Sequence, residues 1–333
     1  MEYKQSGSII KMTGGLYTVR LDGGQAHSPL SGQVVECRAR GNFRHGGLSP
    51  LVGDRVTLQY DDTSFAVDAS GGVSPSADRT GLLITDIHPR KNALIRPPLA
   101  NLDEMLVVLA ASAPAPDIPT IDKLLCILAF NKITPVLVIG KSELDPESAE
   151  DIKALYEKIG YKVYTLSCYT GEGLEDIRRH LAALPEGHIV GLAGASGVGK
   201  STLLNTLFPS LAEVSKTAPV SGDISHRIGR GKNTTRHTEL FSLPELGCYM
   251  ADTAGFSLLD FERFDFFTLD DLPHTFPEMA PLLGDCRYTD CTHLCEEGCA
   301  IVDAVKAGDI PPSRHEAYRT LYAVLKEKKP WKN

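Results

Sequence analysis

Long hydrophobic runs are absent from this sequence, since no uninterrupted apolar stretch is long enough to cross a bilayer. Its first residues, MEYKQSGSIIKM, contain no apolar run of the kind that makes a signal peptide. No internal repeat and no low-complexity segment is present, which argues against a largely disordered chain. We therefore expect a cytoplasmic protein that does not enter a membrane.

An excess of positive charge is also lacking. Lys and Arg number 34 against 42 Asp and Glu, for a net charge of −8, which argues against a uniformly basic nucleic-acid binder. A local basic patch can still bind phosphate groups. One candidate patch combines cations and an aromatic ring, as RNA contacts require, and consists of Arg38, Arg40, Phe43 and Arg44. A solvated basic strand edge with Phe43 in the core is the alternative interpretation.

The eight cysteines are unevenly distributed. Four stand singly and are interpreted as small buried hydrophobic residues: Cys37, Cys126, Cys168 and Cys248. The other four crowd a short span around His293, and in a cytosolic chain such a cluster favours a metal over disulfides.

Three thiolates and one imidazole in this cluster are enough for a closed, tetrahedral Zn²⁺ site with no open position for catalysis. The predicted ligands are Cys286, Cys291, His293 and Cys299. Cys295 falls outside this spacing and is interpreted as an extra cysteine that flanks the site or competes weakly for the metal. The sequence thus predicts a structural zinc.

The 333 residues, 42% of them hydrophobic, suit two or three domains with a substantial core. From about Gly7 to Ile87, short alternating segments predict a small all-β barrel or sandwich, with a hairpin turning near Gly14-Gly15. From Met105, strand-like apolar runs separated by helical ones predict a parallel α/β sheet with crossover helices. Beyond about Phe264 strands largely vanish, and helices follow the Cys cluster.

A phosphate loop is the strongest motif, because it follows the apolar strand HIVGLAG and precedes the helical TLLNTLF. Its glycines let backbone N–H groups wrap a β-phosphate at a helix N-terminus. Lys200 is expected to neutralise the β- and γ-phosphates, and the Ser201 hydroxyl to ligate Mg²⁺. The predicted nucleotide-binding residues here are Gly194, Ala195, Ser196, Gly197, Val198, Gly199, Lys200, Ser201 and Thr202.

A second phosphate-site motif, DTAG, follows the apolar segment CYMA. Asp252 at a strand end can hold Mg²⁺ through water, and Gly255 leaves room for its N–H to approach a γ-phosphate. Between the two motifs, Thr234 and Thr235 offer hydroxyls that complete the Mg²⁺ shell in the triphosphate state. Each threonine is equally consistent with an exposed loop position.

The motifs for reading the base stand in an unusual place. In the usual order of a guanine-nucleotide domain, NKxD and its partner SA loop come after DxxG. Here the nearest match to NKxD is Gly140-Lys141-Ser142-Glu143, ending the strand PVLVIG, and Ser167-Cys168 resembles the SA loop. Both precede the phosphate loop, so the sequence predicts a circularly permuted domain whose missing strands lie upstream.

With these motifs in view, the sequence resembles the circularly permuted, ribosome small-subunit-dependent GTPases, the RsgA/YjeQ family. The resemblance covers nearly the whole chain and includes RGNFR at Arg40–Arg44, LVGDRV at Leu51–Val56 and RPPLANLDEMLVV at Arg96–Val108. It implies an N-terminal OB-fold that touches ribosomal RNA (residues 1–88), a permuted GTPase core (89–263) and a C-terminal, mainly helical zinc domain (264–333).

The resemblance also implies GTP, Mg²⁺ and Zn²⁺ as ligands, and a role in late maturation of the small ribosomal subunit, which stimulates hydrolysis. We expect a monomer that binds the subunit and its rRNA according to nucleotide state. The alternative is a nucleotide-binding RNA assembly scaffold that scarcely turns over. A phosphate-loop ATPase or small-molecule kinase is a weaker interpretation, because no acceptor site is evident.

Catalysis needs a group that orients water. After DxxG, where many small GTPases lead to a water-orienting glutamine, this chain has Phe256-Ser257-Leu258. The family shares this substitution, which fits slow intrinsic turnover and a catalytic group supplied from elsewhere. His237 is a candidate, because imidazole can position or deprotonate water near neutral pH. A histidine that contacts RNA or solvent is the equal alternative.

Recognition of the base also departs from the common pattern. Gly140 cannot make the contacts of the NKxD asparagine, and Glu143 can read guanine N1 and N2 only if its extra methylene is accommodated. Lys141, whose stem covers the ring, is kept. Losing a buried partner costs about 1–3 kcal/mol, so we expect weakened guanine affinity. We still expect GTP to be preferred over ATP, because the carboxylate of Glu143 disfavours adenine.

Overall fold

The computed structural model describes residues 2–24, 28–44, 48–67, 73–75, 81–94, 98–208, 239–251 and 268–327. The chain divides into two compact units. The first consists of Met1–Leu102, Pro185–Gly191 and Ser225–Gly255, and the second of Asp103–Leu184, Leu192–Ile224 and Phe256–Asn333. None of the helices in the described ranges combines the length and apolar character that a membrane span requires.

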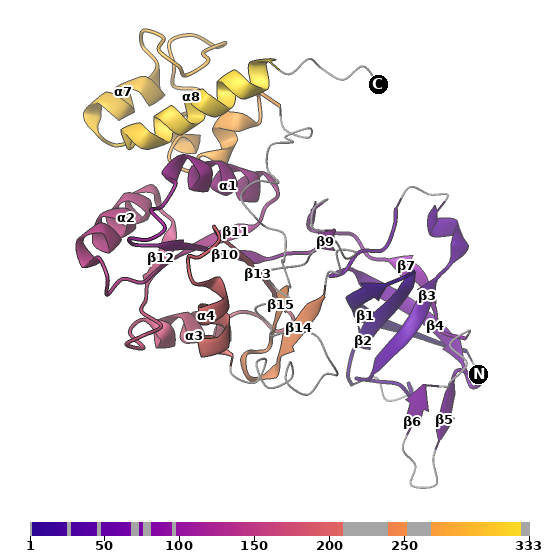
Figure 1. Ribbon diagram of the computed structural model, residues 1–333. Helices are drawn as coiled ribbons and strands as arrows, with labels where there is room; N and C mark the ends of the chain where they lie inside the picture. The colour runs from indigo at the N-terminus through magenta and orange to yellow at the C-terminus, as the bar shows by residue number, and fades with distance from the viewer. Residues whose placement is uncertain are drawn as a thin grey trace. The chain divides into compact units, whose positions relative to one another are not determined.

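A closed five-stranded barrel forms the N-terminal part of the first unit (Figure 1). Its order is β1-β2-β3-β7-β4, built from β1 (Glu2–Thr13), β2 (Leu16–Leu21), β3 (Val34–Ala39), β4 (Arg55–Asp61) and β7 (Leu83–Ile87). Alternate residues such as Ile9, Val19 and Leu58 are fully buried inside it. The predicted barrel is confirmed.

The first hairpin turns where the sequence predicts. Gly14 and Gly15 have φ of +58° and +84°, the left-handed values that a two-residue hairpin loop needs. The barrel is accompanied by the short 3₁₀ helix η1 (Gly41–Arg44). It also carries two pairs of short strands that the sequence did not predict, β5 (Phe65–Val67) with β6 (Val73–Pro75) and β8 (Ala93–Leu94) with β9 (Leu99–Ala100).

A six-stranded sheet has the order β12-β11-β10-β13-β15-β14. Its strands are β10 (Glu104–Ala110), β11 (Thr134–Gly140), β12 (Lys162–Thr165), β13 (Ile189–Ala193), β14 (Leu240–Leu243) and β15 (Cys248–Ala251). β10 pairs with β11, β11 with β12, and β13 with β15 in parallel, whereas β14 is antiparallel to β15. All residues of β10 are buried, as in a parallel strand covered on both faces.

Helices cover the part of the sheet that lies in the second unit. Figure 1 shows α1 (Ile118–Phe130) and α2 (Pro146–Ile159) on one face, and α3 (Leu174–Ala182) and α4 (Lys200–Leu207) on the other. Asp117 and Asp145 are the N-cap residues of α1 and α2. The side chain of each accepts a hydrogen bond from the backbone N–H three residues further along the chain. The alternation of strands and helices confirms the predicted α/β arrangement.

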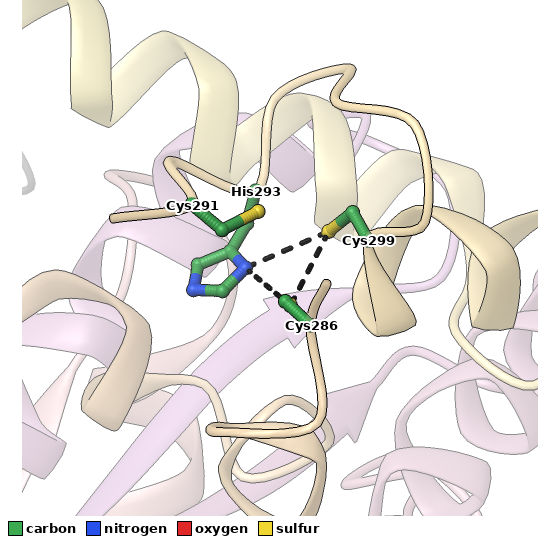
Figure 2. A group of neighbouring side chains, drawn as sticks. All are labelled: Cys286, Cys291, His293 and Cys299. Carbon is green, nitrogen blue, oxygen red and sulfur yellow. Dashed lines mark hydrogen bonds between the residues drawn. The ribbon is translucent and has the colours of Figure 1, made fainter. Parts of the chain in front are cut away.

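No strand occurs in residues 268–327, which lie in the second unit. They form the 3₁₀ helices η4 (Leu272–Thr275) and η5 (Ala280–Leu282) and the helices α7 (Ala300–Ala307) and α8 (Pro312–Glu327). The cysteine cluster lies between η5 and the first turn of α7 (Figure 2).

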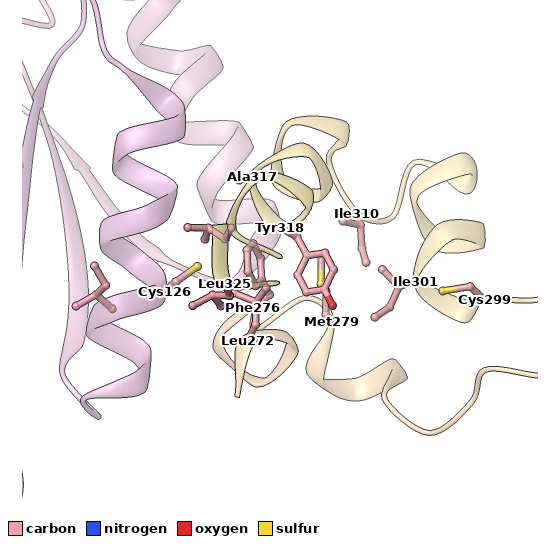
Figure 3. Packing of buried hydrophobic residues seen from close by; sticks show 12 residues of the cluster. Cys126, Leu272, Phe276, Met279, Cys299, Ile301, Ile310, Ala317, Tyr318 and Leu325 are labelled. Carbon is pink, nitrogen blue, oxygen red and sulfur yellow. The ribbon is translucent and has the colours of Figure 1, made fainter. Parts of the chain in front are cut away.

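The helical region packs on α1 through a shared core. Figure 3 shows Cys126 of α1 beside Phe276 and Leu325, with Tyr318 further along the same cluster. Arg314 of α8 is fully buried and donates to Asp122 of α1 at 2.7 Å and to Glu278 at 2.6 Å. Apolar packing and a buried ion network thus hold α8 against α1.

Candidate functional site

The phosphate loop connects β13 to α4, as the sequence predicts. Gly194, Gly197 and Gly199 have φ of +150°, +83° and +105°, which L side chains rarely adopt. A Cβ at Gly194 would lie 2.2 Å from the carbonyl oxygen of Val108, so only glycine fits there. These glycines allow the backbone to approach a phosphate group at the beginning of α4.

Lys200 is the first residue of α4. Its ammonium group donates to the carbonyl oxygens of Gly194 at 2.8 Å and Ala195 at 2.7 Å, so it lies across the phosphate loop. Burial lowers the pKa of Lys200 from its ordinary value. Ser201 follows it in the first turn of α4, next to the N-terminus that favours anions. The loop and both side chains can hold a phosphate group with a metal ion.

The other predicted residues of the phosphate loop occupy its described part. Val198 is buried, Ser196 and Gly197 are exposed, and Thr202 lies on α4 at the edge of a neighbouring cavity. Five predicted site residues lie outside the described residues: Thr234, Thr235, His237, Asp252 and Gly255. The segment CYMA is strand β15 and ends at Ala251, one residue before Asp252.

The 140–143 loop and the phosphate loop lie together, although the first precedes the second by more than fifty residues. The ammonium group of Lys141 donates to the carbonyl oxygen of Gly197 at 2.9 Å and also to that of Ala113. Lys141 itself has a left-handed backbone, with φ of +59°. The backbone N–H of Ser142 donates to the carbonyl oxygen of Leu166 at 3.2 Å, which joins this loop to the 167–168 loop.

Ser167 shapes the 167–168 loop. Its side chain is buried, and its hydroxyl accepts from the backbone N–H groups of Tyr169 at 3.2 Å and Thr170 at 3.0 Å. Cys168 is partly exposed and borders a cavity, so its interpretation as a buried hydrophobic residue is wrong. Burial raises the pKa of the Cys168 thiol, a hydrogen bond with Thr206 opposes this, and the nearby carboxylate of Glu143 raises it further.

A cavity of about 80 Å³ lies between these loops and α4. Its walls are mostly apolar and include Val108, Gly140, Leu166, Val198 and Leu203. Lys141, Cys168 and Thr202 also border it, so residues from all three loop regions meet there. A concave, largely apolar site next to a phosphate loop suits the base of a nucleotide.

The cysteine cluster has the geometry of a tetrahedral zinc site (Figure 2). Sγ of Cys286 lies 3.8 Å from Sγ of Cys299, and Nδ1 of His293 lies 3.5 and 3.6 Å from these two sulfurs. Zn–S bonds of about 2.3 Å and Zn–N bonds of about 2.0–2.1 Å give tetrahedron edges of roughly 3.8 and 3.5–3.6 Å. With Cys291, all four ligand atoms lie within 4.8 Å of one another, so the residues fit zinc.

Glu296 holds the loop between the metal-binding residues, a role that sequence reasoning missed. Its carboxylate accepts from the backbone N–H groups of Thr292 and Leu294, each at 2.9 Å, and of Cys295 at 3.1 Å. Burial alone raises the pKa of Glu296, but the hydrogen bonds from Thr292 and its neighbours outweigh burial and lower it to about 2. An acidic residue inside a cysteine cluster is the only sequence signal of this role.

Helix α8 holds the same loop from its other side. Nε2 of His315 lies 2.7 Å from the carbonyl oxygen of His293. The hydroxyl of Tyr318 donates to the carbonyl oxygen of Thr292 at 2.9 Å. His293 has a left-handed backbone with φ of +61°. These contacts fix the conformation that directs the His293 ring toward the cysteines. Cys295 is exposed and lies outside the group of four.

Comparisons with known proteins agree with this arrangement. The RsgA GTPase family model matches residues 87–262, and the model of the RsgA N-terminal domain matches residues 6–67. The small ribosomal subunit biogenesis GTPase RsgA of Geobacillus kaustophilus is 39% identical over 328 residues, covering 97% of this chain and 98% of that protein. The RsgA of Ruminiclostridium cellulolyticum is 35% identical over 323 residues, which cover 97% of this chain and 94% of that protein.

Two solved structures share the fold along nearly the whole chain. YloQ, described as a circularly permuted GTPase, matches with a TM-score of 0.73 and 28% identity, covering 99% of this chain and 98% of its own. YjeQ from Thermotoga maritima matches with a TM-score of 0.74 and 27% identity, and the match covers 98% of this chain and 100% of the YjeQ chain. The order of the motifs, the fold and the relatives agree, and this chain belongs to the RsgA family of circularly permuted GTPases.

Proposed function

We propose that this chain hydrolyses GTP during biogenesis of the small ribosomal subunit, binding that subunit in a nucleotide-dependent way. The observation that carries the proposal is the contact between Lys141 and Gly197, because it joins an upstream loop to the phosphate loop as a permuted GTPase requires. Relatives named small ribosomal subunit biogenesis GTPase, which cover 97% of the chain, support the choice of partner.

The described residues suggest how the nucleotide is held. Lys200 would move its ammonium group from the carbonyl oxygens of Gly194 and Ala195 to the β- and γ-phosphates, exchanging neutral acceptors for charged ones. Ser201 and Asp252 would hold Mg²⁺, which neutralises charge on the phosphate oxygens. Lys141 would cover one face of the base.

The remaining roles are proposed from the sequence. Glu143 would accept from guanine N1 and N2, with Ser142, Ser167 and Cys168 shaping the pocket around it. Thr234 or Thr235 would contact the γ-phosphate in the triphosphate state. His237 would orient or deprotonate the attacking water, a task for which imidazole is suited near neutral pH.

Zinc would have a structural role in this protein. The four ligands Cys286, Cys291, His293 and Cys299 complete a tetrahedron and leave no position for a substrate. Metal binding would join the loop between η5 and α7 to the beginning of α7, on which Cys299 is the cap residue. We propose that this fixes the helical region in the form that meets the ribosomal partner.

The barrel is the proposed site of rRNA contact. Arg38 on β3 and Arg40, one residue beyond the end of β3, are exposed. Val35 and Cys37, on the opposite face of the same strand, are buried. The side chains of Arg38 and Arg40 are therefore available to phosphate oxygens, which guanidinium groups bind in a bidentate manner.

Sedimentation with purified small ribosomal subunits tests the partner. The chain should pellet with subunits when bound to a non-hydrolysable GTP analogue and much less when bound to GDP. The Lys200→Ala variant, which cannot hold the phosphates, should show no difference between the two nucleotides. Equal pelleting of the wild-type protein with either nucleotide would contradict the proposed nucleotide dependence.

A further inference from the structure

A strand of the barrel contacts the chain directly before β14. Lys11 of β1 and Glu239 form an antiparallel bridge outside the named strand pairs. The ammonium group of Lys11 donates to one carboxylate oxygen of Glu239 at 3.0 Å and lies 2.9 Å from the other. The two residues are 228 positions apart in the sequence, and both belong to the first compact unit. Backbone and side chains therefore join the barrel to this segment.

Lys11 lies beyond the part of β1 that its neighbour β4 covers. β4 pairs with β1 from Glu2 to Ser8, and the pairing of β1 with β2 shifts between Ile9 and Lys11. A bulge of this kind bends a strand and redirects its side chains. The end of β1 thus offers an edge with which a segment from outside the barrel can pair.

Glu239 lies at the junction of the two segments that carry the predicted phosphate-site motifs. In the sequence it follows His237 by two residues. The next residue, Leu240, begins β14 and pairs with Ala251, the residue before Asp252. Because β14 is antiparallel to β15, the end of the first segment and the beginning of the second lie side by side. A contact at Glu239 therefore acts on this junction.

The ion pair is placed to transmit position rather than to stabilise the fold. Its side chains are 40% and 28% exposed, and ion pairs with this exposure contribute little to stability. The barrel also meets β15 elsewhere: burial raises the pKa of Tyr249, and nearby Arg20 and Arg55 of the barrel oppose this. Loss of the Lys11 side chain should therefore leave the barrel and β15 associated.

We infer that Lys11 is a positioning residue for GTP hydrolysis, which connects the barrel through Glu239 to the segment that carries His237. When the barrel is held on the small ribosomal subunit, the ion pair holds the end of this segment and favours hydrolysis, without contact between Lys11 and the nucleotide. The inference rests on the proposed function, since it requires hydrolysis that the subunit stimulates and a barrel that contacts the subunit.

Phosphate release from GTP, with and without a saturating excess of purified small ribosomal subunits, tests this role. Without subunits, Lys11→Ala should release phosphate like the wild-type protein. With subunits its release should be about fivefold slower, the lower end of the usual range for coupling between two sites. Lys4→Ala is the matched control, because Lys4 is an exposed lysine of the same strand, and it should be stimulated like the wild-type protein.

Exchange of the two charges separates this role from a direct contact between Lys11 and rRNA. Lys11→Glu and Glu239→Lys should each lose stimulation, and the double variant should recover most of it, because the ion pair is restored in reverse. A lysine that contacts rRNA phosphates could not be replaced by glutamate in this way. In sedimentation, Lys11→Ala should pellet with the subunits as the wild-type protein does.

Three results would overturn the inference: full stimulation of Lys11→Ala, no recovery in the double variant, or weaker pelleting of Lys11→Ala. Each of these leaves the proposed function intact as long as the wild-type protein is stimulated. If the wild-type protein itself shows no stimulated release, the proposed hydrolysis on the subunit fails and the inference fails with it.

Discussion

The ammonium group of Lys141 lies 2.9 Å from the carbonyl oxygen of Gly197, 56 residues further along the chain. This hydrogen bond joins the end of β11 to the phosphate loop. Lys141 also donates to Ala113 in the loop after β10, so one side chain holds three loops at the carboxyl ends of parallel strands. This is the edge at which α/β sheets bind their ligands.

Removing this contact should weaken nucleotide binding. We expect Lys141→Ala to lower affinity for GDP about tenfold, because a charge-assisted hydrogen bond to the phosphate loop is lost together with the cover over the base. Lys132→Ala is the matched control, since Lys132 is exposed and has a similar left-handed φ of +56°. Calorimetric titration with GDP measures both, and equal affinities of the two variants would contradict this role of Lys141.

The backbone of the phosphate loop makes a steric prediction. Gly194→Ala places a Cβ 2.2 Å from the carbonyl oxygen of Val108, so the loop must shift and GDP affinity should fall by about a hundredfold or more. Gly187 also has a positive φ, of +82°, but a Cβ there meets open space, so Gly187→Ala should bind GDP like the wild-type protein. Unchanged binding by Gly194→Ala would show that the loop tolerates the displacement.

The ion network between α8 and α1 predicts a large stability difference. Arg314→Ala leaves Asp122 and Glu278 without their buried cation, which costs about 3–5 kcal/mol. Arg319→Ala removes an exposed pair with Glu316 and should cost at most about 1 kcal/mol. Urea unfolding of both variants measures the difference, and a loss below about 1 kcal/mol for Arg314→Ala would contradict it.

The same network has a pH dependence. Burial raises the pKa of Asp122 above 3.8, and Arg314 opposes this effect. A carboxyl group with a raised folded-state pKa makes stability fall as the pH rises through that pKa, because the folded state then binds more protons than the unfolded state. The free energy of unfolding that Arg314→Ala loses, relative to the wild-type protein at the same pH, should therefore be larger at pH 8 than at pH 5. An equal loss at both values would exclude Asp122 as its cause.

Glu296 should determine how tightly the cysteine cluster binds zinc. Glu296→Ala releases three backbone N–H groups and should weaken zinc affinity about 10–100-fold, as loss of supporting contacts does in other metal sites. Glu297→Ala removes the exposed neighbouring carboxylate and should have no effect. Competition with a chromogenic chelator measures the affinities, with Cys286→Ser, which lacks one of the four ligands, as the reference for a weakened site. Wild-type affinity in Glu296→Ala would refute the role.

Patterns that repeat along the chain could be predicted from the sequence. Alternating burial in β1 and β4 and complete burial in β10 follow from their hydrophobic periodicity, and the order of motifs predicted the permutation. Strand β14 was not predicted because its burial does not alternate. The predicted domain boundaries and the roles of individual site residues stay predictions.

Contacts between distant residues could not be predicted. Arg314 and the exposed Arg319 both lie in the polar segment SRHEAYRT, where nothing in the sequence distinguishes them. The partner of Arg314, Asp122, is nevertheless 192 residues away. The acceptors of Lys141 are backbone carbonyl oxygens, which every residue carries. Such contacts depend on how loops meet in three dimensions, and a single sequence holds no local signal of them.

Ribosome-stimulated GTP hydrolysis is tested by measuring phosphate release from GTP and from ATP, each with and without purified small ribosomal subunits, with Lys200→Ala as the blank. We expect slow release of phosphate from GTP that the subunit strongly stimulates, and no stimulated release from ATP. Absence of stimulated release with either nucleotide would contradict this expectation and favour an assembly scaffold that binds nucleotide without turnover. Equal use of ATP would show that Glu143 does not read guanine.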